Sequence, residues 1–263
     1  MLVEKSFDTG EVVLNYAEGP DNGSPMLLIH GFPRWWKDFK PIIPEISKSN
    51  QIYAIDLRGH GKSGRANSYT FSDYKQDIIQ FLEKKVKQPA ILFGHSLGGW
   101  ISLMIASTHP SLVKALIIGD SPLNIIERQS MEDYTVARVS DWRKANEDTS
   151  KPTDDSTIRL KKIDLKVFDP WRNIGTDLSA FENLLSGYNL ETILKSIAEV
   201  DCPVLLIQGN TNTVSDSDAE YAKSVLSELH HVYLENHGHY LGLDTGDITD
   251  LRNALLPFLE SIR

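Results

Sequence analysis

The chain has 263 residues, a formal net charge of −9 at pH 7 and a single cysteine. The acidic balance disfavours a nucleic-acid-binding surface, and no apolar run approaches the ~20 residues of a membrane-spanning helix. A lone Cys202 excludes an internal disulfide, and the first residues lack the features of a signal peptide. These properties predict a cytoplasmic protein that does not bind nucleic acid and has no membrane span, and they leave the oligomeric state open.

Short apolar runs alternate with helical patterns through the first half of the chain. Strands are expected at Val3–Phe7, Val12–Ala17, Met26–His30, Ile52–Asp56, Ala90–Phe93 and Ala115–Gly119. Helices are expected over residues 36–47, interrupted by two prolines, over 71–86 with Ser72 as its N-cap, and from residue 100 to 106. This alternation is typical of βαβ units and a parallel sheet.

Residues 123–198 break the pattern, because they are rich in charge and contain no convincing buried strand. We expect a helical lid here, between two parts of an α/β core formed by residues 1–122 and 199–263. Trp142, Trp171 and Tyr188 of the lid could line a substrate pocket or simply fasten the insertion to the core.

The sheet is expected to resume with strands at 204–207 and 231–234 and helices over 216–229 and 248–262. The predicted fold class is therefore α/β, with a mostly parallel eight-stranded sheet, flanking helices and a helical lid.

A glycine-rich turn around Ser96 follows the fifth predicted strand and precedes a helix. Gly94 and Gly98 flank Ser96 in a G-x-S-x-G pattern, which needs this strand–turn–helix context to be meaningful. The glycines allow a sharp bend that exposes the serine hydroxyl, while the helix start directs free N–H groups toward an anion formed there.

A second glycine-rich loop spans Leu57–Gly64. Its spacing fits neither the P-loop nor the dinucleotide fingerprint, so we interpret it as a structural loop rather than a phosphate site.

Four motifs in order along the chain resemble the α/β-hydrolase fold family, from about residue 10 to the end. They are His30–Pro33, Asp56–Ser63, Gly94–Gly99 and Gly238-His239. Together they are specific for the fold but poorly specific for the substrate.

The resemblance implies that Ser96 is the nucleophile and that His239, in the loop after the last strand, is its base. His237 is the alternative base, since it lies two residues away. His95 is expected to point away from the serine, and His30 and His60 are expected to be structural. The backbone N–H groups of Phe32 and Leu97 would form the oxyanion hole.

The acid of the triad departs from the common family pattern. Asn212, an amide, occupies the position after the seventh strand where many members carry a carboxylate. An amide can orient a histidine but cannot stabilise an imidazolium. Asp120, after the sixth strand, matches the position that the haloalkane dehalogenase branch uses, although an aspartate there could merely cap the insertion. Asp216 is the alternative acid.

These residues predict a serine hydrolase that cleaves a small carboxylic ester through an acyl-enzyme on Ser96, with no metal or cofactor. Carbon–carbon bond hydrolase, lactonase, thioesterase and perhydrolase activities fit the same triad, and a slow or non-catalytic ligand-sensing module is a further alternative. Dehalogenases and epoxide hydrolases use aspartate as nucleophile, so Ser96 argues against both.

Overall fold

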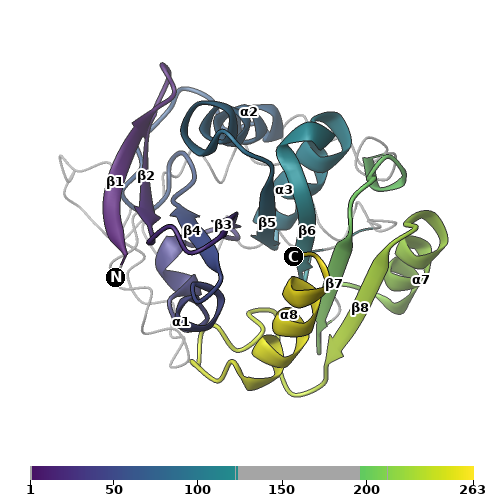
Figure 1. The fold of residues 1–263 in the computed structure, drawn as a ribbon. Coiled ribbons are helices and arrows are strands. Elements are labelled where there is room, and N and C mark those ends of the chain that lie inside the picture. Colours follow the sequence, from purple (N-terminus) through teal and green to yellow (C-terminus); the bar gives the residue numbers. More distant parts are fainter. Residues whose placement is uncertain (1, 122, 124–195, 212) are drawn as a thin grey trace, which may run out of the picture.

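Eight strands form one sheet in a computed structural model that describes residues 2–121, 123, 196–211 and 213–263. The strand order is β1-β2-β4-β3-β5-β6-β7-β8 (Figure 1). β1 and β2, and β2 and β4, pair antiparallel, and every other pair is parallel, which confirms the predicted mostly parallel sheet. The strands are β1 (Val3–Asp8), β2 (Val13–Glu18), β3 (Ser24–Ile29), β4 (Asn50–Ile55), β5 (Ala90–His95), β6 (Val113–Gly119), β7 (Val204–Gly209) and β8 (Leu229–Leu234).

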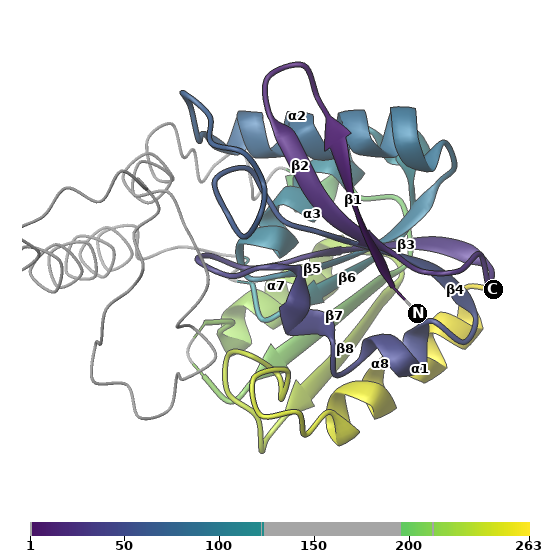
Figure 2. The same cartoon turned by 90° about the vertical axis from the view of Figure 1, so that its left-hand side faces the viewer.

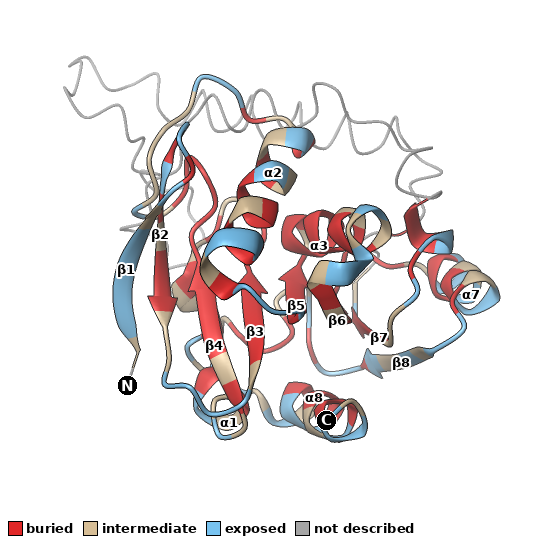
Figure 3. Cartoon of the chain, turned by 45° about the horizontal axis from the view of Figure 1, so that its top comes forward, coloured by how far each residue is buried: buried red, intermediate tan, exposed pale blue. Residues whose placement is uncertain are grey.

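Helices cover both faces of this sheet (Figures 1 and 2). Those with described bounds are η1 (Trp36–Phe39), α1 (Ile43–Ile46), α2 (Phe71–Phe81), η2 (Leu82–Val86), α3 (Leu97–Thr108), η3 (Pro110–Leu112), α7 (Asp216–Val225) and α8 (Thr249–Ser261). One apolar cluster joins α2, α3 and α7 to the sheet, and a second joins η1, α1 and α8 to the opposite face. The parallel strands β3 to β7 are consequently buried, whereas β1 is mostly exposed (Figure 3).

Several element boundaries differ from the sequence prediction. Ser72 is not the N-cap of α2, because the Thr70 hydroxyl accepts from the Asp73 N–H while the Asp73 carboxylate accepts from the Thr70 N–H. The helix expected over 36–47 is two short pieces, η1 and α1, with Pro41 between them. The helix expected over 216–229 ends at Val225, so that β8 can begin at Leu229.

The loop over Leu57–Gly64 is held by charged side chains of the protein itself. Arg58 donates from Nε and Nη2 to the two carboxylate oxygens of Asp77 in α2, at 2.6 and 2.7 Å. Asp56, fully buried just before the loop, accepts from the backbone N–H groups of Trp36 at 2.8 Å and Lys62 at 3.0 Å. These bonds fix the loop against α2 and against the segment that follows β3.

The predicted lid falls almost entirely outside the described residues, as do Trp142, Trp171, Tyr188 and Asn212. The residues on either side of this region are described. Leu123 and Ile197 are both buried in the apolar cluster that also contains α3, so the chain leaves and re-enters the core on the same face of the sheet.

Within the described ranges, every helix is too short or too polar to cross a membrane.

Candidate active site

Ser96 occupies the sharp turn between β5 and α3, with a backbone φ of 51° and ψ of −116°. A residue other than glycine held in this left-handed region costs about 1–3 kcal/mol, so the surroundings must impose it. The Ser96 N–H donates to the carbonyl of Gly119 at 2.9 Å, and the Ser121 hydroxyl donates to the Ser96 carbonyl at 2.8 Å. The turn is thereby fixed to the end of β6.

The two flanking glycines are sterically required in this turn. A Cβ atom added at Gly94 would lie 2.1 Å from the carbonyl oxygen of Gly98, and one added at Gly98 would lie 2.0 Å from that of Ile29. Both obstacles are backbone atoms, which cannot rotate away. The G-x-S-x-G spacing therefore reflects close backbone packing as well as a tight bend.

Asp120 and His239 form a hydrogen-bonded pair beside this turn. Asp120 Oδ2 lies 2.7 Å from His239 Nδ1, and the Asp120 side chain is fully buried. Asp120 Oδ1 accepts from the Gly209 N–H at 2.8 Å. Since an ionised carboxylate can only accept, Nδ1 carries the hydrogen and Nε2 of His239 is left as an acceptor.

The loop that carries His239 lies against the turn that carries Ser96. The rings of His95 and His239 have centroids 4.8 Å apart, and His95 Nε2 donates to the backbone carbonyl of His239 at 2.7 Å. Because Asp120 directly follows Gly119, which accepts from the Ser96 N–H, the three candidate residues gather at the carboxyl ends of β5, β6 and β8. Open α/β sheets bind their ligands at this edge.

His95 thus has a contact that its position in the sequence did not reveal. Burial, with the neighbouring His239, lowers the pKa of His95 to about 3. The ring is therefore neutral at physiological pH and can hold the histidine loop through one N–H donor. It links the serine turn to a loop 144 residues later in the chain.

The two predicted oxyanion donors belong to Phe32 and Leu97. A Cβ atom added at Gly31 would lie 2.9 Å from Ser96 Cβ, so the segment that carries Phe32 passes directly beside the serine. Leu97 is the first residue of α3, and its N–H therefore has no partner within the helix. Both N–H groups belong to segments that adjoin the serine.

The remaining titratable candidates have other surroundings. His237 Nε2 lies 3.2 Å from Asp250 Oδ2, at the start of α8. His30 is fully buried and accepts from the Leu57 N–H at 3.0 Å, and burial holds its pKa well below the usual range. His60 is buried, with Nδ1 2.9 Å from the Arg58 carbonyl oxygen. The carboxylate of Asp216 is exposed in the first turn of α7.

Sequence reasoning missed several polar neighbours of the Asp120–His239 pair. The hydroxyl of Thr211 lies 3.1 Å from Asp120 Oδ2, and the hydroxyl of Thr213 lies 3.4 Å from His239 Nδ1. The Arg34 guanidinium lies 4.4 Å from the centre of the Tyr240 ring and also pairs with Asp38. The available signal was positional. Arg34 lies two residues after Phe32 of the predicted oxyanion segment, and the two threonines flank Asn212. Tyr240 directly follows the predicted base.

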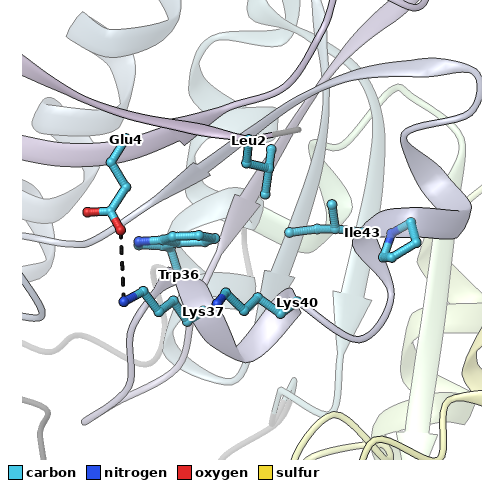
Figure 4. A pocket seen from close by; sticks show the side chains of 7 residues that line it. Leu2, Glu4, Trp36, Lys37, Lys40 and Ile43 are labelled. Atoms are coloured by element: carbon cyan, nitrogen blue, oxygen red, sulfur yellow. Dashed lines mark ion pairs between the residues drawn. The ribbon is translucent and has the colours of Figure 1, made fainter.

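A surface pocket of about 490 Å³ lies between the first residues of β1 and the η1–α1 segment (Figure 4). Its lining contains none of the candidate site residues, and comprises Leu2, Glu4, Trp36, Lys37, Lys40, Ile43 and Pro44. Lys37 Nζ is paired with Glu4 Oε1 at 3.8 Å. In the described part of the chain, no group of three or more histidine, cysteine, aspartate or glutamate residues could hold a metal ion.

Comparison with known proteins places the chain in a family. The sequence profile of the alpha/beta hydrolase fold matches residues 24–159. The chain therefore belongs to the α/β-hydrolase fold family, as the four motifs indicated. Among solved structures, a carboxylesterase from Nitrososphaera gargenis superposes with a TM-score of 0.78 at 22% identity, over 99% of this chain and 98% of that one, and shows the same fold.

Two of the curated relatives are named as hydrolases. A 2-(acetamidomethylene)succinate hydrolase from Mesorhizobium japonicum is 27% identical, over 99% of this chain and 96% of the relative. Epoxide hydrolase 4 from mouse is 32% identical over 112 residues, which span 41% of this chain and 31% of that protein. Family and relatives together support a hydrolase activity acting on a small molecule.

Proposed function

We propose that the protein is a serine hydrolase that cleaves small carboxylic esters, with Ser96, His239 and Asp120 as its triad. The observation that carries this proposal is the 2.7 Å contact between His239 Nδ1 and the buried carboxylate of Asp120, beside a serine in a left-handed turn. This arrangement leaves His239 Nε2 free to accept a proton from a hydroxyl, as a nucleophilic serine requires.

The reaction would run in two steps. Ser96 Oγ attacks the ester carbonyl as His239 takes its proton, and the N–H groups of Phe32 and Leu97 bind the developing oxyanion. Collapse of the tetrahedral intermediate transfers the proton from His239 to the leaving alcohol and forms the acyl-enzyme. Water, deprotonated by His239, then releases the acid. Asp120 keeps the imidazole in the required tautomer and stabilises the imidazolium.

A second candidate substrate comes from a relative that matches over nearly its full length. The Mesorhizobium japonicum protein is named for the hydrolysis of 2-(acetamidomethylene)succinate. The same nucleophile and base could act on a small acid of that type. A cytoplasmic location also remains our proposal, on the basis of the single cysteine in the sequence.

A substrate panel assayed with wild type and Ser96→Ala tests the proposal. It should contain short esters, lactones, thioesters, β-diketones and 2-(acetamidomethylene)succinate. We expect turnover of short esters that falls at least about 10³-fold in Ser96→Ala, since removal of a triad serine leaves only binding and oxyanion stabilisation. Ester turnover that survives in Ser96→Ala would contradict the proposal. Turnover confined to another substrate class would keep the triad and replace the substrate.

A further inference from the structure

The loop after β7 lies beside the Asp120–His239 pair, where the carboxyl ends of β6, β7 and β8 adjoin (Figure 1). Its backbone contacts both sides. The Gly209 N–H donates to Asp120 Oδ1 at 2.8 Å, and the Asn210 N–H donates to the His237 carbonyl at 2.7 Å. The loop is thus fixed to the acid and to the histidine loop before any of its side chains is considered.

Two threonine hydroxyls extend from this loop to the pair. Thr211 Oγ1 lies 3.1 Å from Asp120 Oδ2, the same oxygen that lies 2.7 Å from His239 Nδ1. Thr213 contacts Thr211 twice, because its N–H donates to Thr211 Oγ1 at 3.2 Å and the two hydroxyl oxygens are 2.9 Å apart.

The donor and the acceptor in each of these threonine contacts can be assigned by counting the available hydrogens. Thr211 has a single hydroxyl hydrogen, and a buried carboxylate is a stronger acceptor than a neutral hydroxyl. The Thr211 hydroxyl therefore donates to Asp120, and the N–H and hydroxyl of Thr213 donate to Thr211. Asp120 Oδ2 then receives two donors, one from His239 and one from Thr211, while Oδ1 is held by Gly209.

We propose that Thr211 is a positioning residue, which holds Asp120 in the orientation that His239 needs and shares the charge of its carboxylate. The inference rests on the proposed function, in which Asp120 is the acid. In the sequence, this loop carries Asn212 where many family members have their acid. We thus assign the loop a different role in the same site, in which its hydroxyls donate hydrogen bonds toward the carboxylate that follows the neighbouring strand.

Steady-state kinetics of Thr211→Val test this role, because valine keeps the shape of threonine but removes its hydroxyl. Thr211→Ser is the matched variant, since serine retains the hydroxyl. We expect kcat for ester hydrolysis to fall about tenfold in Thr211→Val with KM unchanged, as expected for loss of a hydrogen bond to a charged group. The acidic limb of the kcat/KM pH profile should move to higher pH, because a carboxylate with one donor fewer stabilises the imidazolium more strongly. Thr211→Ser should restore both quantities.

Three results would overturn the inference. They are wild-type kcat and pH profile in Thr211→Val, a lower kcat with an unmoved profile, and a loss that Thr211→Ser does not restore. Thr108→Val controls for the loss of a threonine hydroxyl as such. The exposed Thr108 hydroxyl contacts only the Met104 carbonyl and the neighbouring His109 in the described residues.

A spectroscopic arm separates this inference from the proposed function. The low-field proton resonance of His239 Nδ1–H, assigned by its loss in His239→Ala, needs no substrate. We expect it to shift in Thr211→Val and to return in Thr211→Ser, whatever the enzyme hydrolyses. An unchanged resonance would refute the role of Thr211 even if ester hydrolysis is confirmed, whereas a shift without esterase activity would refute the substrate alone.

Discussion

Asp120 is the residue on which the proposed chemistry depends most directly. It has a φ of 42°, in the left-handed region, and its N–H donates to the Ile207 carbonyl at 2.7 Å. Aspartate tolerates this conformation better than most residues. The turn directs a fully buried carboxylate at His239, whereas the carboxylate of Asp216 is exposed in the first turn of α7.

Replacement of the acid by its amide tests the choice between these two aspartates. Asp120→Asn should lower kcat by about 10⁴-fold, the effect known for the same exchange in the chymotrypsin triad, because the amide favours the wrong imidazole tautomer. Steady-state kinetics and a thermal melt give the result, with the melting temperature showing that the fold is intact. The matched variant Asp216→Asn should retain wild-type kcat, and the reverse pattern would move the acid to Asp216.

The β5–turn–α3 element depends on glycine at two positions. The Cβ atom of an alanine at Gly98 would lie 2.0 Å from the Ile29 carbonyl oxygen, so β3 and the serine turn would have to separate. Gly98→Ala should destabilise the fold by about 1–3 kcal/mol through overpacking. It should also lower kcat further than the lost stability explains, because the oxyanion segment follows β3. Urea unfolding and kinetics measure the two effects.

Gly19→Ala is the control for this substitution. An added Cβ there would meet Leu2 Cδ2 at 3.4 Å, which is ordinary contact. We expect Gly19→Ala to leave both stability and kcat close to wild type. If Gly98→Ala were equally harmless, the close approach of β3 and the serine turn would not be needed for the site.

Strand positions could be predicted because buried parallel strands are continuous apolar runs, as at Leu205–Ile207. Helix boundaries were harder to predict. Both Thr70 and Ser72 could cap α2, and only the reciprocal bonds with Asp73 select Thr70. Propensity likewise does not show that α7 must end at Val225 to bring the chain back to the sheet edge.

The candidate site was likewise predictable only in part. Ser96, His239 and Asp120 follow strands, so topology alone predicts that they lie at one edge of the sheet. Thr211 and Thr213 lie in an irregular loop, where no periodicity indicates the direction of a side chain. Their contacts with Asp120 and His239 depend on loop geometry that only the structure provides.

At the scale of the whole molecule, buried neutral histidines make stability depend on pH. The pKa of His95 is lowered by burial and by His239 to about 3, and burial also holds the pKa of His30 far below its usual range. Below pH 6.5 the unfolded chain binds protons that these side chains cannot accept in the folded state. Their contribution to stability is therefore present above that pH and is lost as the pH falls.

The largely buried carboxyl of Asp38 acts in the opposite direction over the same range. Burial raises the pKa of Asp38 to about 6 despite its pairing with Arg34. Protonation of Asp38 therefore adds about 1 kcal/mol to the free energy of unfolding between pH 7 and pH 5. His95 alone lowers that free energy by about 2 kcal/mol over the same range. His30 adds to the loss.

We therefore expect the free energy of unfolding to fall between pH 7 and pH 5. Urea titrations at a series of pH values measure this slope, which should be shallower in His95→Gln. The slope should not change in His230→Gln, because His230 is exposed. A protein more stable at pH 5 than at pH 7 would show that the buried carboxyls outweigh the histidines.

The central claim is that Ser96 is a nucleophile activated by His239 and Asp120. Incubation with a fluorophosphonate probe, followed by peptide mapping by mass spectrometry, tests it without knowledge of the substrate. We expect one covalent adduct, located on Ser96, which is absent in Ser96→Ala and forms far more slowly in His239→Ala and Asp120→Asn. Folded wild-type protein that remains unlabelled, or an adduct on another residue, would contradict the account and favour a ligand-sensing module.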